Sequence, residues 1–202
     1  MMIDEGYIKY RGEWVADGPI DARAAETLDT WRRPLHEAGL VGEYADTGIG
    51  FGNLSIRCEG STFYISGTQT GHLAATDGRH YSLVTDYDID GNAVYCRGPV
   101  QASSESLTHA AIYELDASIG GIVHVHSARL WHALRGKLPT TSDTVAYGTP
   151  AMAHEFERLY RQSAFADLGL VVMGGHEEGL ISIGSDLEEA AMRILGLDNE
   201  FR

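Results

Sequence analysis

The chain has few cysteines and no long hydrophobic run. Its 202 residues include two cysteines, Cys58 and Cys96. Two cysteines outside any Cys-x-x-Cys pair are too few for a disulfide framework, so we expect reduced thiols in a core or a strand. No run of eighteen apolar residues occurs, and the N-terminus is acidic and lacks the apolar segment of a secretory signal. The sequence therefore predicts neither a transmembrane helix nor a secreted protein.

Basic residues are also scarce. The chain has 15 Lys and Arg against 29 Asp and Glu, which gives a formal net charge of −14 at pH 7. This charge fits a salt-adapted host or simply a soluble surface, and it argues against binding to nucleic acid or to an anionic membrane. We therefore expect neither partner, and the reduced thiols together with the lack of a secretory signal predict a cytoplasmic protein.

The length fits one α/β domain. Residues 1–20 place Tyr7, Tyr10 and Trp14 among charged residues, which predicts an extended arm or an edge strand. Such aromatic side chains need a surface to cover, and a neighbouring subunit would supply one. Residues 21–202 are interpreted as a single catalytic domain.

Helical and strand patterns alternate through this domain. Strands are predicted at 54–57, 62–66, 83–88, 93–97, 168–173 and 180–183, and around the two histidines of the motif described next. Helices are predicted at 21–40, 105–115, 128–134, 150–162 and 186–197, with Ser104 and Ser185 as caps and Pro150 at a first helical position. Because helices are interspersed with hairpin-like strands, we expect a three-layer α/β/α fold with a central mixed, largely antiparallel sheet.

The most informative stretch is Gly120-Gly121-Ile122-Val123-His124-Val125-His126-Ser127. Side chains alternate along a strand, so His124 and His126 point to the same side. Two imidazoles aimed at one point are half of a zinc-type site. The pair alone decides nothing, because nine histidines in this chain give about 0.4 His-x-His pairs by chance.

Four other short motifs accompany this pair. They are Gly52-Asn53-Leu54-Ser55-Ile56-Arg57, Ser66-Gly67-Thr68, Ser103-Ser104-Glu105 and Gly175-His176. Together with His-x-His, the ordered set resembles the class II aldolase/adducin family, which includes the L-fuculose-phosphate aldolases and the L-ribulose-5-phosphate 4-epimerases. Each motif is unspecific alone, whereas the ordered set is specific. The resemblance covers about residues 21–197 and implies the family's fold.

The resemblance implies that His124, His126 and His176 hold a divalent metal ion, zinc in the first place and manganese or another ion otherwise. Three neutral imidazoles leave such an ion its positive charge and an open position. The alternative for the first two is a buried hydrogen-bonded pair, and for His176 a structural or surface role. Glu177 stands where the family has glycine, and it could itself reach the metal.

Glu105 is the acid–base residue that the resemblance implies. From its position alone, it could equally be a first-turn carboxylate that interacts with the helix dipole. His109 lies four residues later on the same helix face. We interpret it either as a residue that orients Glu105 or as an ordinary core histidine.

The resemblance also implies a pocket for a substrate phosphate. Short polar side chains, glycine amides and a helix N-terminus bind anions without lysines, which suits so acidic a chain. The residues that would form it are Asn53, Ser66, Gly67, Ser103 and Ser104. The same residue types serve in turns and caps, and one role does not exclude the other.

A second proton donor is harder to place. The family's aldolases use tyrosines from a C-terminal tail and from a neighbouring subunit, and its epimerases use an aspartate from a neighbour. The last predicted helix ends close to Arg202, so we expect no such tail here. Asp143 and Tyr147 are therefore the candidate acids, with structural loop roles as the alternative. We expect a homotetramer with active sites at subunit interfaces.

The implied function is that of a metal-dependent aldolase, a lyase acting on a small phosphorylated ketose. It would cleave or form a carbon–carbon bond through a metal-stabilised enediolate, with Glu105 moving the proton. Epimerase, dehydratase or decarboxylase chemistry on the same scaffold is the alternative. A non-catalytic adducin-like scaffold domain is the alternative of another class, although a scaffold does not need Glu105 together with His124 and His126.

Overall fold

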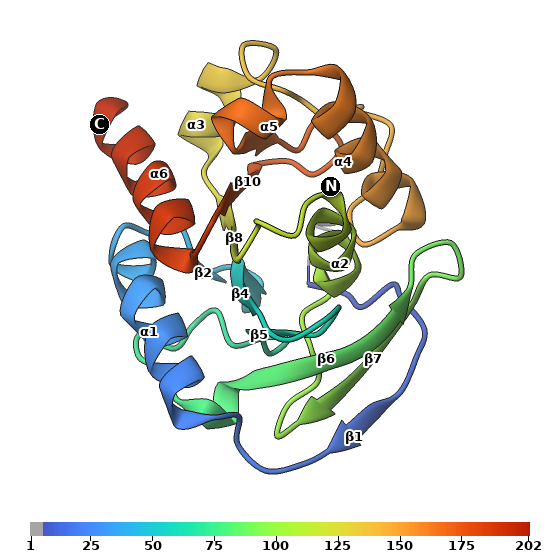
Figure 1. Ribbon diagram of the computed structural model, residues 1–202. Helices are drawn as coiled ribbons and strands as arrows, with labels where there is room; N and C mark the ends of the chain where they lie inside the picture. The colour runs from blue at the N-terminus through green and yellow to red at the C-terminus, as the bar shows by residue number, and fades with distance from the viewer. Residues whose placement is uncertain (1–5) are drawn as a thin grey trace.

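A large twisted sheet runs through the protein in the computed structural model, which describes residues 6–202 (Figure 1). Its strands are β1 (Trp14–Ala16), β4 (Asn53–Arg57), β5 (Phe63–Ser66), β6 (Tyr81–Asp88), β7 (Ala93–Gly98), β8 (Gly121–His126), β9 (Leu170–Val172) and β10 (Gly179–Gly184). The strand order is β1-β7-β6-β5-β4-β8-β10-β9. The β1–β7 pairing is parallel, and the other pairings among these strands are antiparallel.

Helices cover both faces of this sheet. They are α1 (Ala22–Glu37), α2 (Ser106–Leu115), α3 (Ala128–Leu134), α4 (Pro150–Gln162), α5 (Phe165–Leu168) and α6 (Leu187–Glu200), with a short 3₁₀ helix η1 (Gly78–His80). Apolar residues of α1, α3 and α6 form one buried cluster against the sheet, and those of α2, α4 and α5 form another on the opposite face. The predicted three-layer fold with a largely antiparallel sheet is confirmed. No helix within residues 6–202 is long and apolar enough to cross a membrane.

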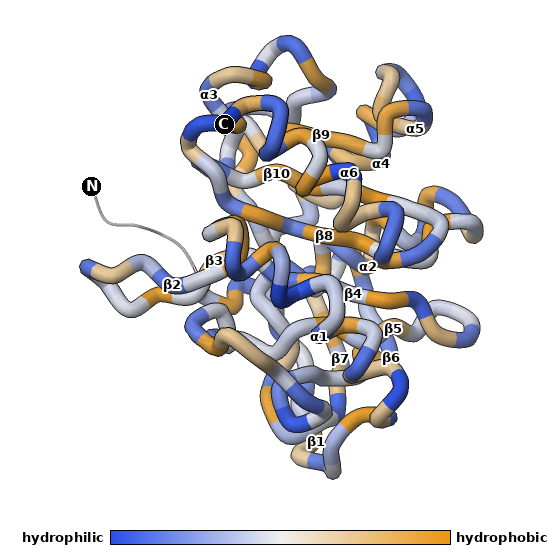
Figure 2. Tube along the Cα trace, turned by 90° about the vertical axis from the view of Figure 1, so that its left-hand side faces the viewer, coloured by the Kyte–Doolittle hydropathy of each residue, from blue (hydrophilic) through white to orange (hydrophobic). Residues whose placement is uncertain are grey.

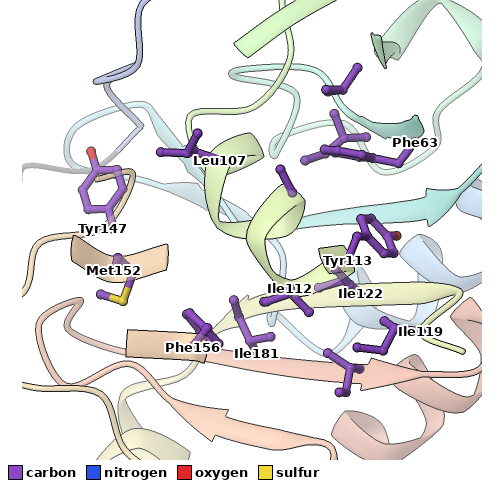
Figure 3. Packing of buried hydrophobic residues seen from close by; sticks show 14 of the residues in the cluster. Phe63, Leu107, Ile112, Tyr113, Ile119, Ile122, Tyr147, Met152, Phe156 and Ile181 are labelled. Carbon is purple, nitrogen blue, oxygen red and sulfur yellow. The ribbon is translucent and has the colours of Figure 1, made fainter. Parts of the chain in front are cut away.

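Strand β8 lies at the centre of the fold, and all six of its residues are buried. Its hydrophobic residues stand out in Figure 2, where it runs between β10 and β4. Val123 and Val125 pack into the cluster of α1, α3 and α6, whereas Ile122 packs into the cluster of α2, α4 and α5. Figure 3 shows Ile122 near Ile112 of α2. Because side chains alternate, His124 and His126 face the same side of the sheet as Ile122, toward α2.

Helix starts follow recognisable capping chemistry, with some shifts from the prediction. Pro150 does open α4, behind Thr149 as N-cap. The predicted cap Ser185 is wrong, because Asp186 occupies the N-cap of α6 and accepts a hydrogen bond from the Glu189 amide. Ser185 instead donates its hydroxyl to the Glu189 carboxylate at 2.8 Å. An acidic side chain accepts from a free helix amide as well as serine does, so either residue could have been the cap.

The start of α2 also differs from the prediction. Glu105, not Ser104, occupies its N-cap position, and no side chain caps the helix there. The Ser106 hydroxyl donates to the Ser103 carbonyl at 2.6 Å, and the Ser103 hydroxyl accepts from the Glu105 amide at 3.3 Å. The serine-rich turn is therefore stabilised by its own hydrogen bonds, which leaves the Glu105 side chain available for another role.

Two segments contain regular structure that the sequence did not predict. The glycine-rich turn at 47–53 includes β3 (Ile49–Phe51), which pairs with β2 (Gly42–Tyr44) as a separate hairpin. At the other segment, Leu168 ends α5, and Gly169 with φ +64° turns the chain into β9. This strand therefore starts later than its predicted residue 168, because a left-handed glycine ends the helix first.

The N-terminal segment packs on its own chain. The predicted edge strand is confirmed as β1, beside β7. Tyr10 is buried in the cluster of α2 and α4, and its hydroxyl donates to the Ala102 carbonyl at 2.8 Å. Tyr7 is 63 % exposed, and its backbone amide donates to the hydroxyl of Tyr147 at 3.3 Å. The first five residues of the predicted arm lie outside the described residues.

Candidate active site

Three imidazoles converge on the α2 side of the sheet. His124 and His126 come from β8, and His176 comes from the turn between β9 and β10. The Nε2 atoms of His126 and His176 are 3.1 Å apart, and one ligand atom from each of the three rings lies within 4.8 Å of the others. Burial lowers the pKa of His124 to about 3 and the pKa values of the other two well below their usual range. The three side chains are therefore neutral at physiological pH, which is the form that binds metal.

A tight backbone approach brings His176 to the other two rings. Gly179 is the β-sheet partner of His126, and a Cβ atom at Gly179 would lie 2.7 Å from Cδ2 of His176. On the other side of the turn, a Cβ atom at Gly175 would lie 1.9 Å from the Val145 carbonyl oxygen. Both glycines thus leave room for the ring and for the 141–145 segment that crosses the turn.

Hydrogen bonds to Nδ1 orient two of the rings. Asn53 is the cross-strand partner of His124, and its Nδ2 lies 3.1 Å from His124 Nδ1. The Tyr44 hydroxyl lies 3.0 Å from His126 Nδ1 and donates to Oε2 of Glu178 at 2.9 Å. Partners of this kind fix ring orientation in metal sites. Because both contacts involve Nδ1, the Nε2 atoms are the ones that face the common centre.

Glu105 completes this cluster. Its side chain is 2 % exposed, and its Oε1 lies 3.9 Å from Nε2 of His176. Within residues 6–202, neither of its carboxyl oxygens has a hydrogen-bond partner, and neither does Nε2 of His124. Burial raises the pKa of Glu105 to about 7, while the Thr108 hydroxyl and the Lys9 ammonium oppose that rise. Three neutral imidazoles lie beside a carboxyl group, and several of the buried nitrogen and oxygen atoms of this set have no hydrogen-bond partner in that part of the chain. Such a set of ligand atoms fits a divalent ion such as zinc.

Of the two interpretations of His109, the contacts of its side chain favour the core histidine. Its Nδ1 lies 2.7 Å from the Ser55 hydroxyl, which also lies 2.8 Å from the Tyr113 hydroxyl. The ring is thus held by the sheet, and no hydrogen bond joins its side chain to Glu105 among the described residues. Burial and the neighbouring His124 lower the pKa of His109 well below its usual value.

The Gly-Asn-x-Ser-x-Arg motif places alternate side chains of β4 on the α2 side of the sheet. Asn53 meets His124, and Ser55 holds His109 of α2. Arg57 donates to the carbonyl oxygens of Tyr113 and Asp116 at the end of α2, at 2.6 and 2.9 Å. A cation suits the negative end of a helix dipole. The Gly-Asn-x-Ser-x-Arg pattern therefore fixes α2, and with it Glu105, against the histidine strand.

A polar hollow adjoins the cluster. It is lined by Gly6, Gly50, Gly52, Asn53, Gly67, Thr68, Gln69, Thr70, Gly71, Ser103 and Ser104. Four of the five residues predicted for a phosphate pocket are in this lining. The exception is Ser66, whose hydroxyl accepts from the Leu54 amide at 3.1 Å and so joins β4 to β5. The lining carries hydroxyls, amides and glycine backbone, which suit an anion.

The two candidate acids lie in different surroundings. Asp143 is 61 % exposed and forms an ion pair with Arg135. Tyr147 is buried, and its ring centroid lies 4.5 Å from that of His176. Its hydroxyl accepts from the Tyr7 amide, so it faces the N-terminal segment. Figure 3 shows the Tyr147 ring at the edge of the packed core.

Three residues near the site were not predicted from the sequence. Glu178 is one of them, and it accepts from the Tyr44 hydroxyl, which in turn contacts His126. Its neighbour Glu177, the further candidate for a metal ligand, is exposed and lies outside the histidine cluster. Lys9 places its ammonium 3.7 Å from the centroid of the Tyr147 ring. The missed residues are Tyr44, Glu178 and Lys9. No pattern could have revealed Tyr44 or Lys9, because each reaches the site only through the folded chain.

Comparison with known proteins decides the family. Residues 39–202 match the sequence profile of the class II aldolase and adducin N-terminal domain. The chain belongs to the class II aldolase/adducin family. The resemblance inferred from the five motifs is thereby confirmed. No curated protein gives a significant match to the sequence.

Several solved structures share the fold of this class II aldolase family member. L-Fuculose-1-phosphate aldolase from Thermus thermophilus is 20 % identical, with a TM-score of 0.61 and coverage of 89 % of each chain. A sugar-phosphate aldolase from Thermotoga maritima is 17 % identical, with a TM-score of 0.66 and coverage of 86 % of this chain and 91 % of that one. YgbL from Klebsiella pneumoniae, a candidate aldolase/epimerase/decarboxylase, is 18 % identical, with a TM-score of 0.65 and coverage of 88 % and 86 %. At these identities the likeness establishes the fold.

Proposed function

We propose that this protein is a metal-dependent lyase that reversibly cleaves a carbon–carbon bond in a small phosphorylated ketose. The observation that carries the proposal is the buried Glu105 carboxyl beside three converging neutral imidazoles, next to a hollow lined by anion-binding groups. Two of the structures that share the fold are aldolases of sugar phosphates, which supports the same substrate class.

The polar hollow would bind the substrate phosphate. Ser103, Ser104, Asn53 and the glycine-rich backbone around Gly67 line one volume, and their hydroxyl, amide and N–H groups are neutral donors. Several preorganised neutral donors can hold an anion in a chain of net charge −14 without a local excess of lysine. The bound phosphate would fix the carbon chain so that its carbonyl end reaches the histidine cluster.

Proton transfer would fall to Glu105. A divalent ion held by His124, His126 and His176 would act as a Lewis acid toward the substrate carbonyl. In the condensation direction Glu105 removes a proton from the carbon next to that carbonyl, and in the cleavage direction it returns the proton to the same carbon. A pKa of about 7 suits both steps, because the carboxyl gives and takes protons readily near neutrality.

A second acid–base group is needed at the substrate hydroxyl beside the bond that is cleaved. This hydroxyl loses its proton in the cleavage direction and regains one in the condensation direction. Asp143 is exposed and so could serve the site of a neighbouring chain, whereas Tyr147 stacks on His176 of its own chain. A homotetramer with shared sites is part of the proposal, and it would allow the exposed Asp143 to reach a neighbouring site. The test mixes a Glu105→Gln chain with an Asp143→Asn chain, each inactive alone. Regained activity in the mixed oligomer would support Asp143 acting across an interface, and no recovery in a verified mixed oligomer would remove it from that role.

The function is tested with the zinc-loaded protein and a set of phosphorylated ketoses. Release of a two- or three-carbon product, followed by coupled assay, would support the proposal if it disappears after chelation and in Glu105→Gln. Conversion of a substrate to an epimer or loss of carbon dioxide, dependent on the same residues, would replace cleavage by one of the alternative chemistries. Absence of bound metal after purification without chelator, with no turnover on addition of zinc, would favour a non-catalytic scaffold.

A further inference from the structure

Asn53 belongs to both halves of the proposed site. It begins β4, directly opposite His124 in the sheet, so the two side chains lie side by side on one face. It is 5 % exposed and also lines the polar hollow, together with Ser103 and Gly67. A single side chain therefore lies between the histidine cluster and the proposed phosphate pocket.

The contacts of the Asn53 amide leave one end to be satisfied. One end lies 3.1 Å from His124 Nδ1, while the other, the Oδ1 position, is buried without a hydrogen-bond partner among the described residues. A carboxamide has a double donor at one end and an acceptor at the other, in nearly the same shape. A buried amide end without a partner costs free energy until something pairs with it.

The ring of His124 determines which end is needed. If Nε2 of His124 binds a metal ion, the ring proton is on Nδ1, and this N–H needs an acceptor. The Asn53 amide supplies this acceptor once it is rotated, so that its carbonyl oxygen takes the place of the Nδ2 atom that lies 3.1 Å from His124 Nδ1. The NH₂ group then occupies the other end, where it can donate to an anion in the hollow.

We infer that Asn53 is a positioning residue that couples the metal centre to the anion pocket. An anion that accepts from the Asn53 NH₂ group holds the carbonyl oxygen toward His124. That orientation favours the Nδ1–H tautomer, which presents the Nε2 lone pair to a metal ion. By linkage, metal and anion must strengthen each other's binding by the same factor. This inference rests on the proposed function, because it takes the cluster to bind metal and the hollow to bind phosphate.

The experiment measures the affinity for Co²⁺ by competition with a chromophoric chelator, with and without saturating inorganic phosphate, and the affinity for phosphate with and without the metal. In the unmodified protein we expect each ligand to tighten the other about fivefold or more. In Asn53→Ala we expect metal affinity to fall about tenfold or more, and the mutual strengthening to be reduced to the residual attraction between a cation and an anion.

Asn53→Asp separates the two contacts within a side chain of the same shape. Its carboxylate still accepts from His124 Nδ1–H, so metal affinity is retained or increased, whereas phosphate affinity falls because two anions repel each other. A merely structural role would move both affinities in the same direction. Circular dichroism and thermal unfolding check that each variant is folded.

Two control variants each touch one half of the site. Ser103→Ala removes a hydroxyl from the lining of the hollow and should lower phosphate affinity. Tyr44→Phe removes the hydrogen-bond partner of His126 and should lower metal affinity. In both variants each ligand should still tighten the binding of the other. If both ligands bind and tighten each other equally in the unmodified protein and in Asn53→Ala, the inference about Asn53 is overturned while the proposed function still stands. Failure of the unmodified protein to bind either ligand would reject the proposed function and the inference with it.

Discussion

The two sides of the candidate site are built from different kinds of structure. On one side, His124, His126 and Asn53 lie on central strands, and Glu105 lies at the start of a helix packed on those strands. His176 belongs to this side although it lies in a turn, because its ring packs closely against Gly179 of β10. On the other side, Asp143, Tyr147 and Lys9 come from segments without helix or strand. The regular side is buried and nearly free of charge, whereas the irregular side includes an exposed ion pair and a cation over an aromatic ring.

This difference suggests a division of labour. Groups that must converge within a few ångströms need neighbours that hold them, and the central strands supply such neighbours through register and hydrogen bonds. Groups that choose a substrate or meet another chain can sit on loops, which vary without cost to the core. The predictions that follow test whether function depends on the regular side much more than on the irregular side.

The largest expected effect comes from the regular side, at Glu105. Glu105→Gln keeps the shape of the side chain but removes its proton chemistry, so we expect turnover to fall by about 10²–10⁴ while phosphate affinity stays the same. Steady-state kinetics and phosphate titration measure the two quantities. Glu114→Gln, at an exposed position of the same helix, is the matched control and should change turnover by less than about twofold. A near-normal rate in Glu105→Gln would refute its role as acid and base.

The same substitution should stabilise the metal-free protein at alkaline pH. The pKa of Glu105 is raised from 4.5 to about 7 in the folded state, so its contribution to stability is fully present below pH 4.5 and is lost as pH rises toward 7. The loss amounts to about 3 kcal/mol, from the difference between the two pKa values. Glutamine stays uncharged, so chelated Glu105→Gln should resist urea better than the unmodified protein at pH 8, with little difference at pH 4.5. Equal stability at pH 8 would mean that the buried carboxyl is compensated by another group.

Gly179 tests the geometry that brings His176 to the other histidines. A methyl group there would lie 2.7 Å from the His176 ring, so Gly179→Ala should displace the ring. We expect metal affinity to fall by about 10- to 100-fold, as for loss of a supporting contact. Gly196→Ala is the control, because its added methyl meets no atom within 4 Å. Unchanged Co²⁺ affinity in Gly179→Ala would show that the close packing around His176 is not needed for metal binding.

Sequence reasoning succeeded where chemistry coincides with regular periodicity. The i, i+2 spacing of His124 and His126 was enough to place both rings on one face, and the position of Glu105 after two serines placed it at a helix start. The interspersion of helical and hairpin-like strand patterns likewise predicted the layers of the fold. These features depend on neighbours in the chain, and a sequence displays such neighbours directly.

The rest depended on which distant segments meet. The motif placed Ser66 in the phosphate pocket, whereas its hydroxyl bonds to Leu54 on the next strand. Spacing allows His109 either to orient Glu105 or to be an ordinary core histidine, and the bond to Ser55 on β4 is the contact that its ring makes. Tyr44 and Lys9 gave no signal at all, because their roles arise from long-range packing. Spacing predicts the face on which a side chain lies, and tertiary packing decides its partner.

The smallest expected effect comes from two tyrosines that each adjoin one histidine of the cluster. The Tyr44 hydroxyl is bonded to His126 Nδ1 and to Glu178, whereas Tyr147 meets His176 with its ring and turns its hydroxyl to Tyr7. Removing the hydroxyl from Tyr44 breaks the chain that orients His126, so Tyr44→Phe should lower metal affinity about tenfold. Tyr147→Phe keeps the stacked ring, so metal affinity should change by less than about twofold.

Competition with a chromophoric chelator, on both variants and under identical conditions, measures this difference. The two substitutions remove the same atom from the same residue type, so the ratio of their effects reports hydrogen bonding to the ring nitrogen separately from ring packing. If Tyr147→Phe weakened metal binding as much as Tyr44→Phe, the contact of Tyr147 with the N-terminal segment would support the metal site as firmly as the β2–β3 hairpin does through Tyr44. Metal binding would then depend on the irregular side of the site as much as on the regular side, and the proposed difference between the two sides would be wrong.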